Sequence, residues 1–192
     1  MPSRLDSLQK LSRVYFPFIC MELPMAISMH DLSVPIFTRL LANLSGQLDK
    51  AAAYAAEKKF DSAVLVNARL APDMFPLSRQ VQIACDFAKG CSARLAGVEV
   101  PKREDNETTL DQLKARIAWT RDFIGSIPKD KFNGAEDRPI VHEMRTMTIK
   151  LPGLAYLEHF SMPNFYFHVM ATYAILRHNG VALGKADFVG SP

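Results

Sequence analysis

Apolar residues recur at alternating steps of four and three along three stretches of the chain, which is the spacing of one face of an α-helix. This pattern predicts a first helix that begins after an N-cap at Ser33 and runs to about residue 57, and further helices over residues 77–95 and 110–127. A fourth helix is expected from about Pro163 to Asn179. Proline suits the first turn of a helix, and Gly180 suits the left-handed position that ends one.

The connections between these helices are long. A short helix is expected within residues 61–70. Residues 129–150 lose the helical period, and there Ile140, His142 and Met144 alternate with residues of the opposite face, which predicts a strand or hairpin. Long connections often shape one end of a helical bundle into a pocket. The pattern therefore predicts an all-α four-helix bundle with a short extended insertion before its last helix.

The composition is that of a soluble globular domain, with 48% hydrophobic and 22% charged residues. A length of 192 residues fits a single domain. The 23 Lys and Arg residues are interleaved with 20 Asp and Glu residues, so no nucleic-acid partner is expected. No apolar run can span a membrane, and the three cysteines suit a reducing compartment. We therefore expect a cytoplasmic protein without a membrane partner.

The beginning of the chain stands apart from this pattern. Basic residues precede a short apolar patch over residues 14–21, as in a signal peptide, but Pro17 and Pro24 interrupt the patch and no small-residue cleavage site follows. We expect residues 1–28 to be a poorly structured N-terminal extension and residues 29–192 to be the folded domain. A processed targeting segment is one alternative, and a functional start at Met25 or Met29 is another.

The candidate chemistry lies on the last predicted helix. Asn164 and His168 are one turn apart on the apolar face, so both polar side chains need partners in the core. They form either a buried hydrogen-bond network or half of a metal site, since neutral imidazole is a common ligand of zinc and nickel. His159 is expected to cap the entrance of this helix or to reach into the same end of the bundle. The other histidines fall in loops or at helix ends: His30, His142 and His178.

Further polar and aromatic residues lie off the core faces or in the second half of the chain. Asp86, Arg94 and Asp122 lie off the apolar faces of their helices and are expected to be solvated. The aromatic residues, Trp119 among them, are expected to pack in the core, with the lining of an apolar pocket as the alternative.

The end of the chain resembles a domain-of-unknown-function family. The residues that carry the resemblance are Leu157-Glu158-His159-Phe160-Ser161-Met162-Pro163-Asn164-Phe165-Tyr166-Phe167-His168, with residues 174–181 and 184–187. That family is grouped with the DinB/YfiT-like metalloenzyme superfamily, and the resemblance covers about residues 29–190. It implies an up-down-down-up four-helix bundle with a long crossover, often dimeric.

The resemblance also implies a metal site. In the superfamily, one histidine of the second helix and two on the last helix bind a divalent metal, and some members are thiol-dependent transferases or hydrolases. His168 matches one ligand position, whereas Asn164 occupies the position one turn earlier. The second helix offers Ser78, Gln80 and Gln82, but no histidine. Such a site is degenerate, because amide oxygens do not replace nitrogen donors for zinc.

We therefore expect a DinB-like bundle protein that binds a small molecule in a polar and aromatic pocket around Asn164 and His168. The other residues expected in this pocket are His159, Gln82 and Trp119. One alternative is a metal-dependent transferase or hydrolase, with His168 as the chief ligand of zinc or nickel and His159 or a glutamine completing the site. Another alternative is a structural dimerisation module. A homodimer is the expected assembly.

Overall fold

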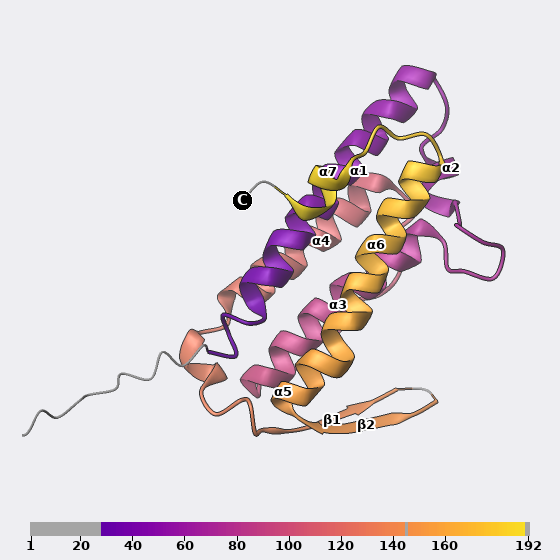
Figure 1. The fold of residues 1–192 in the computed structure, drawn as a ribbon. Coiled ribbons are helices and arrows are strands. Elements are labelled where there is room, and N and C mark those ends of the chain that lie inside the picture. Colours follow the sequence, from indigo (N-terminus) through magenta and orange to yellow (C-terminus); the bar gives the residue numbers. More distant parts are fainter. Residues whose placement is uncertain (1–27, 145, 191–192) are drawn as a thin grey trace, which may run out of the picture.

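Four long helices form the body of the protein in the computed structural model, which describes residues 28–144 and 146–190 (Figure 1). They are α1 (Val34–Lys58), α3 (Leu77–Ala96), α4 (Leu110–Ser126) and α6 (Met162–His178). Each covers a predicted helix, so the predicted architecture is confirmed. The extension predicted over residues 1–28 lies outside the described residues, apart from its last residue.

Side-chain contacts between the helices give their relative directions. Pairs of contacts in order along the chain show that α3 and α4 are parallel, whereas α4 runs antiparallel to α1 and α3 runs antiparallel to α6. This is the up-down-down-up arrangement that the resemblance implies. For α3 and α4 the pairs are Asp86–Arg116 and Lys89–Trp119. For α1 and α4 they are Asp31–Lys129, just outside the two helices, and Asp49–Lys114. For α3 and the last helical segment they are Gln80–His168 and Phe87–Phe160.

The helix ends follow the local sequence in most places. Thr109 caps α4 by accepting a hydrogen bond from the backbone N–H of Gln112, and the Gln112 side chain returns one to the Thr109 N–H. Gly180 ends α6 at a φ of 94°. Ser33 holds the N-cap position of α1, but its side chain does not cap the helix, and its hydroxyl donates to the Met29 carbonyl at 2.6 Å.

The last long helix begins earlier than the sequence predicts. The backbone is helical from α5 (Gly153–Tyr156) through the π-helical turn η2 (Leu157–Ser161) into α6. Pro163 therefore marks a position inside a longer helical segment. A proline has no N–H to donate to the carbonyl four residues earlier, and such a break is relieved where the helix widens into a π-turn.

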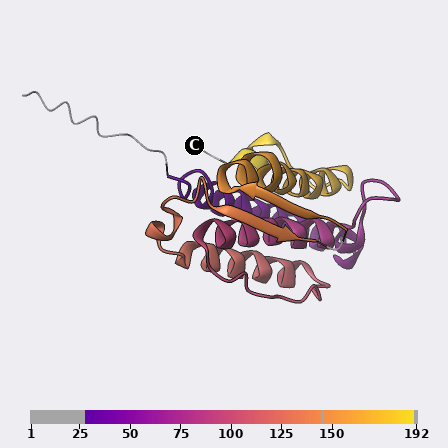
Figure 2. The ribbon, with the colours of Figure 1, turned by 90° about the horizontal axis from the view of Figure 1, so that it is seen from below.

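An antiparallel hairpin precedes α5, as the alternation predicts. Its strands are β1 (Pro139–Glu143) and β2 (Thr148–Pro152), with Ile140 opposite Leu151 and His142 opposite Ile149. Ile140 is buried and Val141 is 54% exposed, which confirms the alternation. The hairpin lies at the edge of the bundle, beside the α5 end of the last helix (Figures 1 and 2).

Short helices complete the described chain. They are α2 (Ala63–Asn67), the 3-10 turn η1 (Lys129–Phe132) and α7 (Lys185–Val189). The α7 segment is held against α1 by Asn43 and Gln47, whose amides donate to backbone carbonyls of Phe188 and Asp187 at 3.0 and 3.1 Å. Across residues 28–144 and 146–190, no helix combines the length and apolar character needed to cross a bilayer.

Candidate functional site

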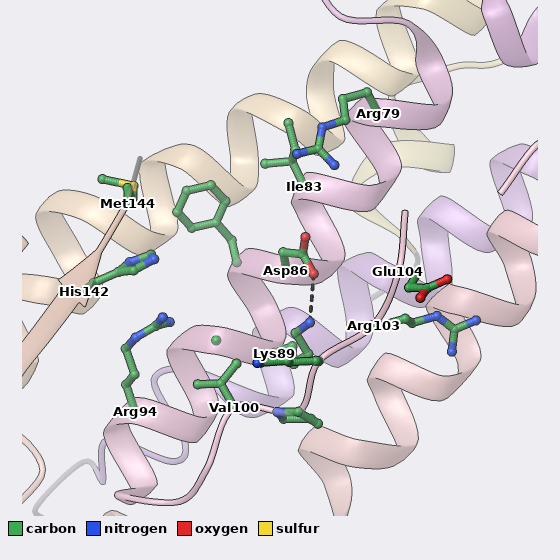
Figure 3. Close-up of a pocket in the computed structure, with 14 residues that line it drawn as sticks. Arg79, Ile83, Asp86, Lys89, Arg94, Val100, Arg103, Glu104, His142 and Met144 are labelled. Atoms are coloured by element: carbon green, nitrogen blue, oxygen red, sulfur yellow. Dashed lines mark ion pairs between the residues drawn. The ribbon is translucent and has the colours of Figure 1, made fainter. Parts of the chain in front are cut away.

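A cleft of about 880 Å³ opens along α3. Three segments that are far apart in the sequence line it: one face of α3, residues 100–104, and the end of β1 with Met144 (Figure 3). The α3 residues are Arg79, Ile83, Asp86, Phe87, Lys89, Gly90 and Arg94. Their spacing places them on the side of α3 opposite its buried stripe of Leu77, Val81, Ala84 and Ala88.

The cleft combines an apolar wall with basic side chains. Apolar surface comes from Ile83, Phe87, Val100, Pro101 and Met144. Five of the lining residues are basic and two are acidic, which leaves an excess of positive charge. A concave, largely apolar surface with a few placed polar groups is the usual form of a small-molecule site.

Arg116 of α4 holds the 100–104 wall in place. Its side chain is 1% exposed and donates to the Glu107 carboxylate at 3.1 Å and to the Glu104 carbonyl at 3.1 Å. It also pairs with Asp86 at 3.0 Å and with Asp105 at 2.8 Å. One buried guanidinium therefore connects α3, α4 and the segment between them.

Lys89 is a buried cation in the wall of the cleft. Its side chain is 7% exposed, and Nζ lies 2.9 Å from an Asp86 oxygen. Nζ also lies 5.7 Å from the ring centroid of Trp119, which has the Arg103 guanidinium carbon at 4.9 Å. Trp119, the single tryptophan of the chain, therefore contacts two cations of the cleft.

Arg94 lies at the hairpin end of the cleft, where Gly90 makes room for it. A Cβ atom at position 90 would lie 2.5 Å from Arg94 Nη1, so the guanidinium occupies the space that a side chain would need. Arg94 Nη1 donates to the Tyr156 hydroxyl at 3.5 Å. Among the described residues, no carboxylate forms an ion pair with Arg94, unlike Arg79, Lys89 and Arg103.

Tyr156 also contacts His142 of β1. The phenol oxygen lies 3.0 Å from His142 Nδ1. Burial is the main cause that lowers the pKa of His142 to about 4, with the charge of Arg94 adding to it, and burial raises the pKa of Tyr156. Both groups are therefore neutral near pH 7. Because Arg94 only donates, the Tyr156 hydroxyl can donate to His142 Nδ1, which leaves the proton of the ring on Nε2.

His168 and Gln80 meet in the core between α6 and α3. His168 Nδ1 lies 2.7 Å from Gln80 Oε1, and Gln80 Nε2 donates to the Phe75 carbonyl at 3.1 Å, so the imidazole proton lies on Nδ1. Burial, with a smaller effect of the Arg79 charge, lowers the pKa of His168 to about 4. Its ring stacks on Phe87, with centroids 6.0 Å apart, and Phe87 itself lines the cleft.

The other residues expected in the pocket lie apart from this pair. The Asn164 amide donates to the Phe160 carbonyl of its own helix at 2.7 Å, and His159 is exposed on η2. Gln82 donates to Glu107, in the segment that precedes α4, at 3.0 Å. None of the five predicted pocket residues is among the described residues that line the cleft. Three of them contact its lining: His168 contacts Phe87, Gln82 contacts Arg79, and Trp119 contacts Arg103.

The donors near His168 do not fit a divalent metal site. The imidazole proton lies on Nδ1 toward an amide oxygen, and the Asn164 amide is engaged with its own backbone. Zinc in proteins takes three or four donors from imidazole, thiolate and carboxylate groups. In the part of the chain that the structure describes, no three His, Cys, Asp or Glu side chains are grouped to hold a metal ion. Burial also raises the pKa of the Cys85 and Cys91 thiols to about 12.

Comparison with known proteins places this architecture in a family. The model of a domain of unknown function, DUF1993, matches residues 29–189. The chain belongs to this family. It is similar to the crystal structure of a DinB family member protein from Shewanella denitrificans, with 44% sequence identity and a TM-score of 0.80, over 85% of this chain and 92% of that chain. A search of curated proteins finds no match.

The cleft of this DUF1993 protein contains residues that sequence reasoning assigned to solvent. Asp86 and Arg94 were expected to be solvated, but the 100–104 segment and the hairpin cover their face of α3, and Asp86 is 38% exposed and paired. A signal was present in the sequence. A solvated helix face is uniformly polar, whereas this one carries Ile83, Phe87 and Gly90 between its charges.

Proposed function

We propose that this DUF1993 protein binds a small organic molecule with an apolar body in the cleft beside α3. The observation that carries the proposal is the cleft itself, whose volume of about 880 Å³ lies within the range of small-molecule sites. Ile83, Phe87 and Val100 offer apolar surface from two segments, and the buried Lys89 places a charged group at the wall.

The sequence-based expectation centred the pocket on Asn164 and His168, and the proposal keeps only part of it. His168 is placed behind Phe87 and supports that ring, with Gln80 fixing the imidazole. Asn164 supports the turn into α6 through the Phe160 carbonyl. In this proposal both residues hold the wall of the cleft and neither touches the ligand.

A fluorescent dye tests the proposal. N-phenylnaphthylamine, an uncharged aromatic probe, is titrated into the wild-type protein and into Ile83→Glu, which places a carboxylate on the apolar wall. We expect saturable binding by the wild type and a Kd raised about tenfold or more in the variant.

The matched control is Val64→Glu, at a 60% exposed apolar position on α2, where the Kd should change by less than about twofold. Circular dichroism melting establishes that each variant is folded. Binding that Ile83→Glu leaves intact, or that Val64→Glu abolishes, would refute the proposal.

The second candidate function is a homodimerisation module, favoured by the outer face of α6. Tyr166, Phe167 and Met170 are 41%, 56% and 48% exposed, and their spacing places them on one side of the helix. Light scattering coupled to size-exclusion chromatography tests this candidate. The wild type should have the mass of a dimer and Phe167→Glu that of a monomer, whereas a monomeric wild type would remove the candidate.

A further inference from the structure

We infer that the molecule bound in the cleft is an organic acid, and that Arg94 binds its acidic group at the hairpin end. This inference rests on the proposed function, since it specifies the ligand of the same cleft. Arg94 is identified by comparing the basic side chains of the cleft, since most of the others already form ion pairs with carboxylates.

Most of the basic side chains in the cleft form ion pairs with carboxylates. Arg79 pairs with Asp105, Lys89 with Asp86 at 2.9 Å, and Arg103 with Glu107 at 3.4 Å. Among the described residues, this leaves Arg94 and Lys102 without an ion pair. Lys102 is exposed on the rim, where water solvates an ammonium well, whereas Arg94 is half-buried. A half-buried guanidinium without a carboxylate favours an incoming anion.

The acidic residues of the cleft are not placed to neutralise Arg94. Asp86 is shared between Arg116 and Lys89, at 3.0 and 2.9 Å. Glu104 is exposed, and its backbone carbonyl is held by Arg116. Figure 3 shows Arg94 and His142 at one side of the cleft and Glu104 at the opposite side.

Gly90 leaves space for the Arg94 guanidinium beside α3. A Cβ atom at position 90 would lie 2.5 Å from Arg94 Nη1, which is the far end of a flexible side chain. With glycine at this position, the guanidinium lies along the helix and faces the cleft.

Tyr156 orients His142, which adds one neutral donor beside this guanidinium. The Tyr156 oxygen accepts from Arg94 and its proton is donated to His142 Nδ1, at 3.5 and 3.0 Å. His142 then carries a proton on Nε2, and Figure 3 shows its ring extending into the cleft near Arg94. A planar guanidinium with a neighbouring N–H donor matches the oxygens of an acidic group, while Phe87 and Ile83 accommodate an apolar body.

Two dyes that differ by one acidic group test the inference. Anilinonaphthalene sulfonate carries a sulfonate that N-phenylnaphthylamine lacks, and both are titrated into the wild type, Arg94→Met and Lys102→Met. We expect Arg94→Met to raise the Kd of the sulfonate about tenfold or more, and to change that of the uncharged dye by less than about twofold.

The control variant and the possible negative results distinguish the inference about Arg94 from the proposed binding function. Lys102→Met removes an exposed cation of the same cleft and should leave both Kd values within about twofold of the wild type. If Arg94→Met binds the sulfonate as the wild type does, or loses both dyes equally, the inference is overturned. In the first case, retained binding of the uncharged dye keeps the proposed function. If the wild type binds neither dye, both proposals fall.

Discussion

Gly90 and Arg94 lie one turn apart on α3, and the guanidinium occupies space that the glycine leaves open. The glycine costs the helix about 0.5–1 kcal/mol relative to alanine. The Arg94 guanidinium lies over position 90 and donates to the Tyr156 hydroxyl at 3.5 Å.

His168 is expected to make the stability of the fold depend on pH. Its pKa is about 4 in the folded protein and about 6.5 when unfolded, so its stabilising contribution is present above about pH 6.5 and is lost as the pH falls toward 4. One pKa unit corresponds to about 1.4 kcal/mol. Between about pH 7 and 5, urea unfolding should show the wild type losing about 2 kcal/mol more than His168→Gln.

The control for this experiment is His159→Gln, at an exposed position of η2. It should keep the pH dependence of the wild type. If His168→Gln also keeps that dependence, the buried neutral imidazole is not its source.

The metal content of the protein is predicted from the same residue. Protein prepared without a histidine tag should contain less than about a tenth of an equivalent of zinc, nickel or iron. A site with three ligands would retain its metal through purification, whereas His168 is hydrogen-bonded to the Gln80 amide and lacks such a ligand set. Elemental analysis measures this directly. Stoichiometric metal that is lost in His168→Ala would contradict the interpretation of the site.

Helical spacing was enough to predict that Asn164 and His168 share a face, but not what each side chain binds. Gln80, the partner of His168, is 88 positions away in the sequence and on another helix. Asn164 instead bonds to the backbone of its own helix, a local competition that spacing does not reveal. Hydrogen-bond partners depend on packing between helices, and a single sequence does not contain that information directly.

The segment from Gly97 to Thr109 forms one wall of the cleft, and ion pairs attach it to α4. Arg116 of α4 pairs with Glu107 and Asp105 of this segment, and both Arg116 and Glu107 are buried. Removing one partner of a buried ion pair leaves the other without compensation.

Arg116→Met should therefore lower the free energy of unfolding by about 3–5 kcal/mol and increase hydrogen exchange across residues 98–109. Lys114→Met is the matched control, because Lys114 lies on the same helix and pairs with the exposed Asp49. It should cost less than about 1 kcal/mol. Equal effects of the two substitutions would show that the Arg116 network does not hold the segment.

Helices and strands that bury one apolar face could be predicted from the sequence, because burial of one face leaves a period in the apolar residues. Segments without such a period could not be predicted. The four long helices and the hairpin follow directly from periods in the sequence. The helical backbone of residues 153–161 was missed because Pro163 resembles a helix start, whereas the π-turn accommodates it. The 97–109 segment has no period at all, so its path along α3 depends on ionic contacts between separate helices.

At the scale of the whole molecule, the up-down-down-up bundle creates the cleft. Because α3 and α4 run parallel, the chain between them must return along the length of α3, and the hairpin then packs beside the end of α3 (Figure 2). The cleft thus joins residues 79–94, 100–104 and 142–144. The long connections predict a pocket at one end of the bundle, but they do not indicate which three segments form it.

Amide chemical-shift mapping shows where on the protein an acidic dye binds. Two-dimensional nitrogen–proton spectra of the labelled protein are recorded with increasing anilinonaphthalene sulfonate. We predict shifts that cluster on Ile83–Arg94, Val100–Glu104 and the end of β1 at His142, and that are lost from the hairpin end in Arg94→Met. Shifts confined to the outer face of α6 around Phe167, or to the surroundings of Asn164, would contradict the account.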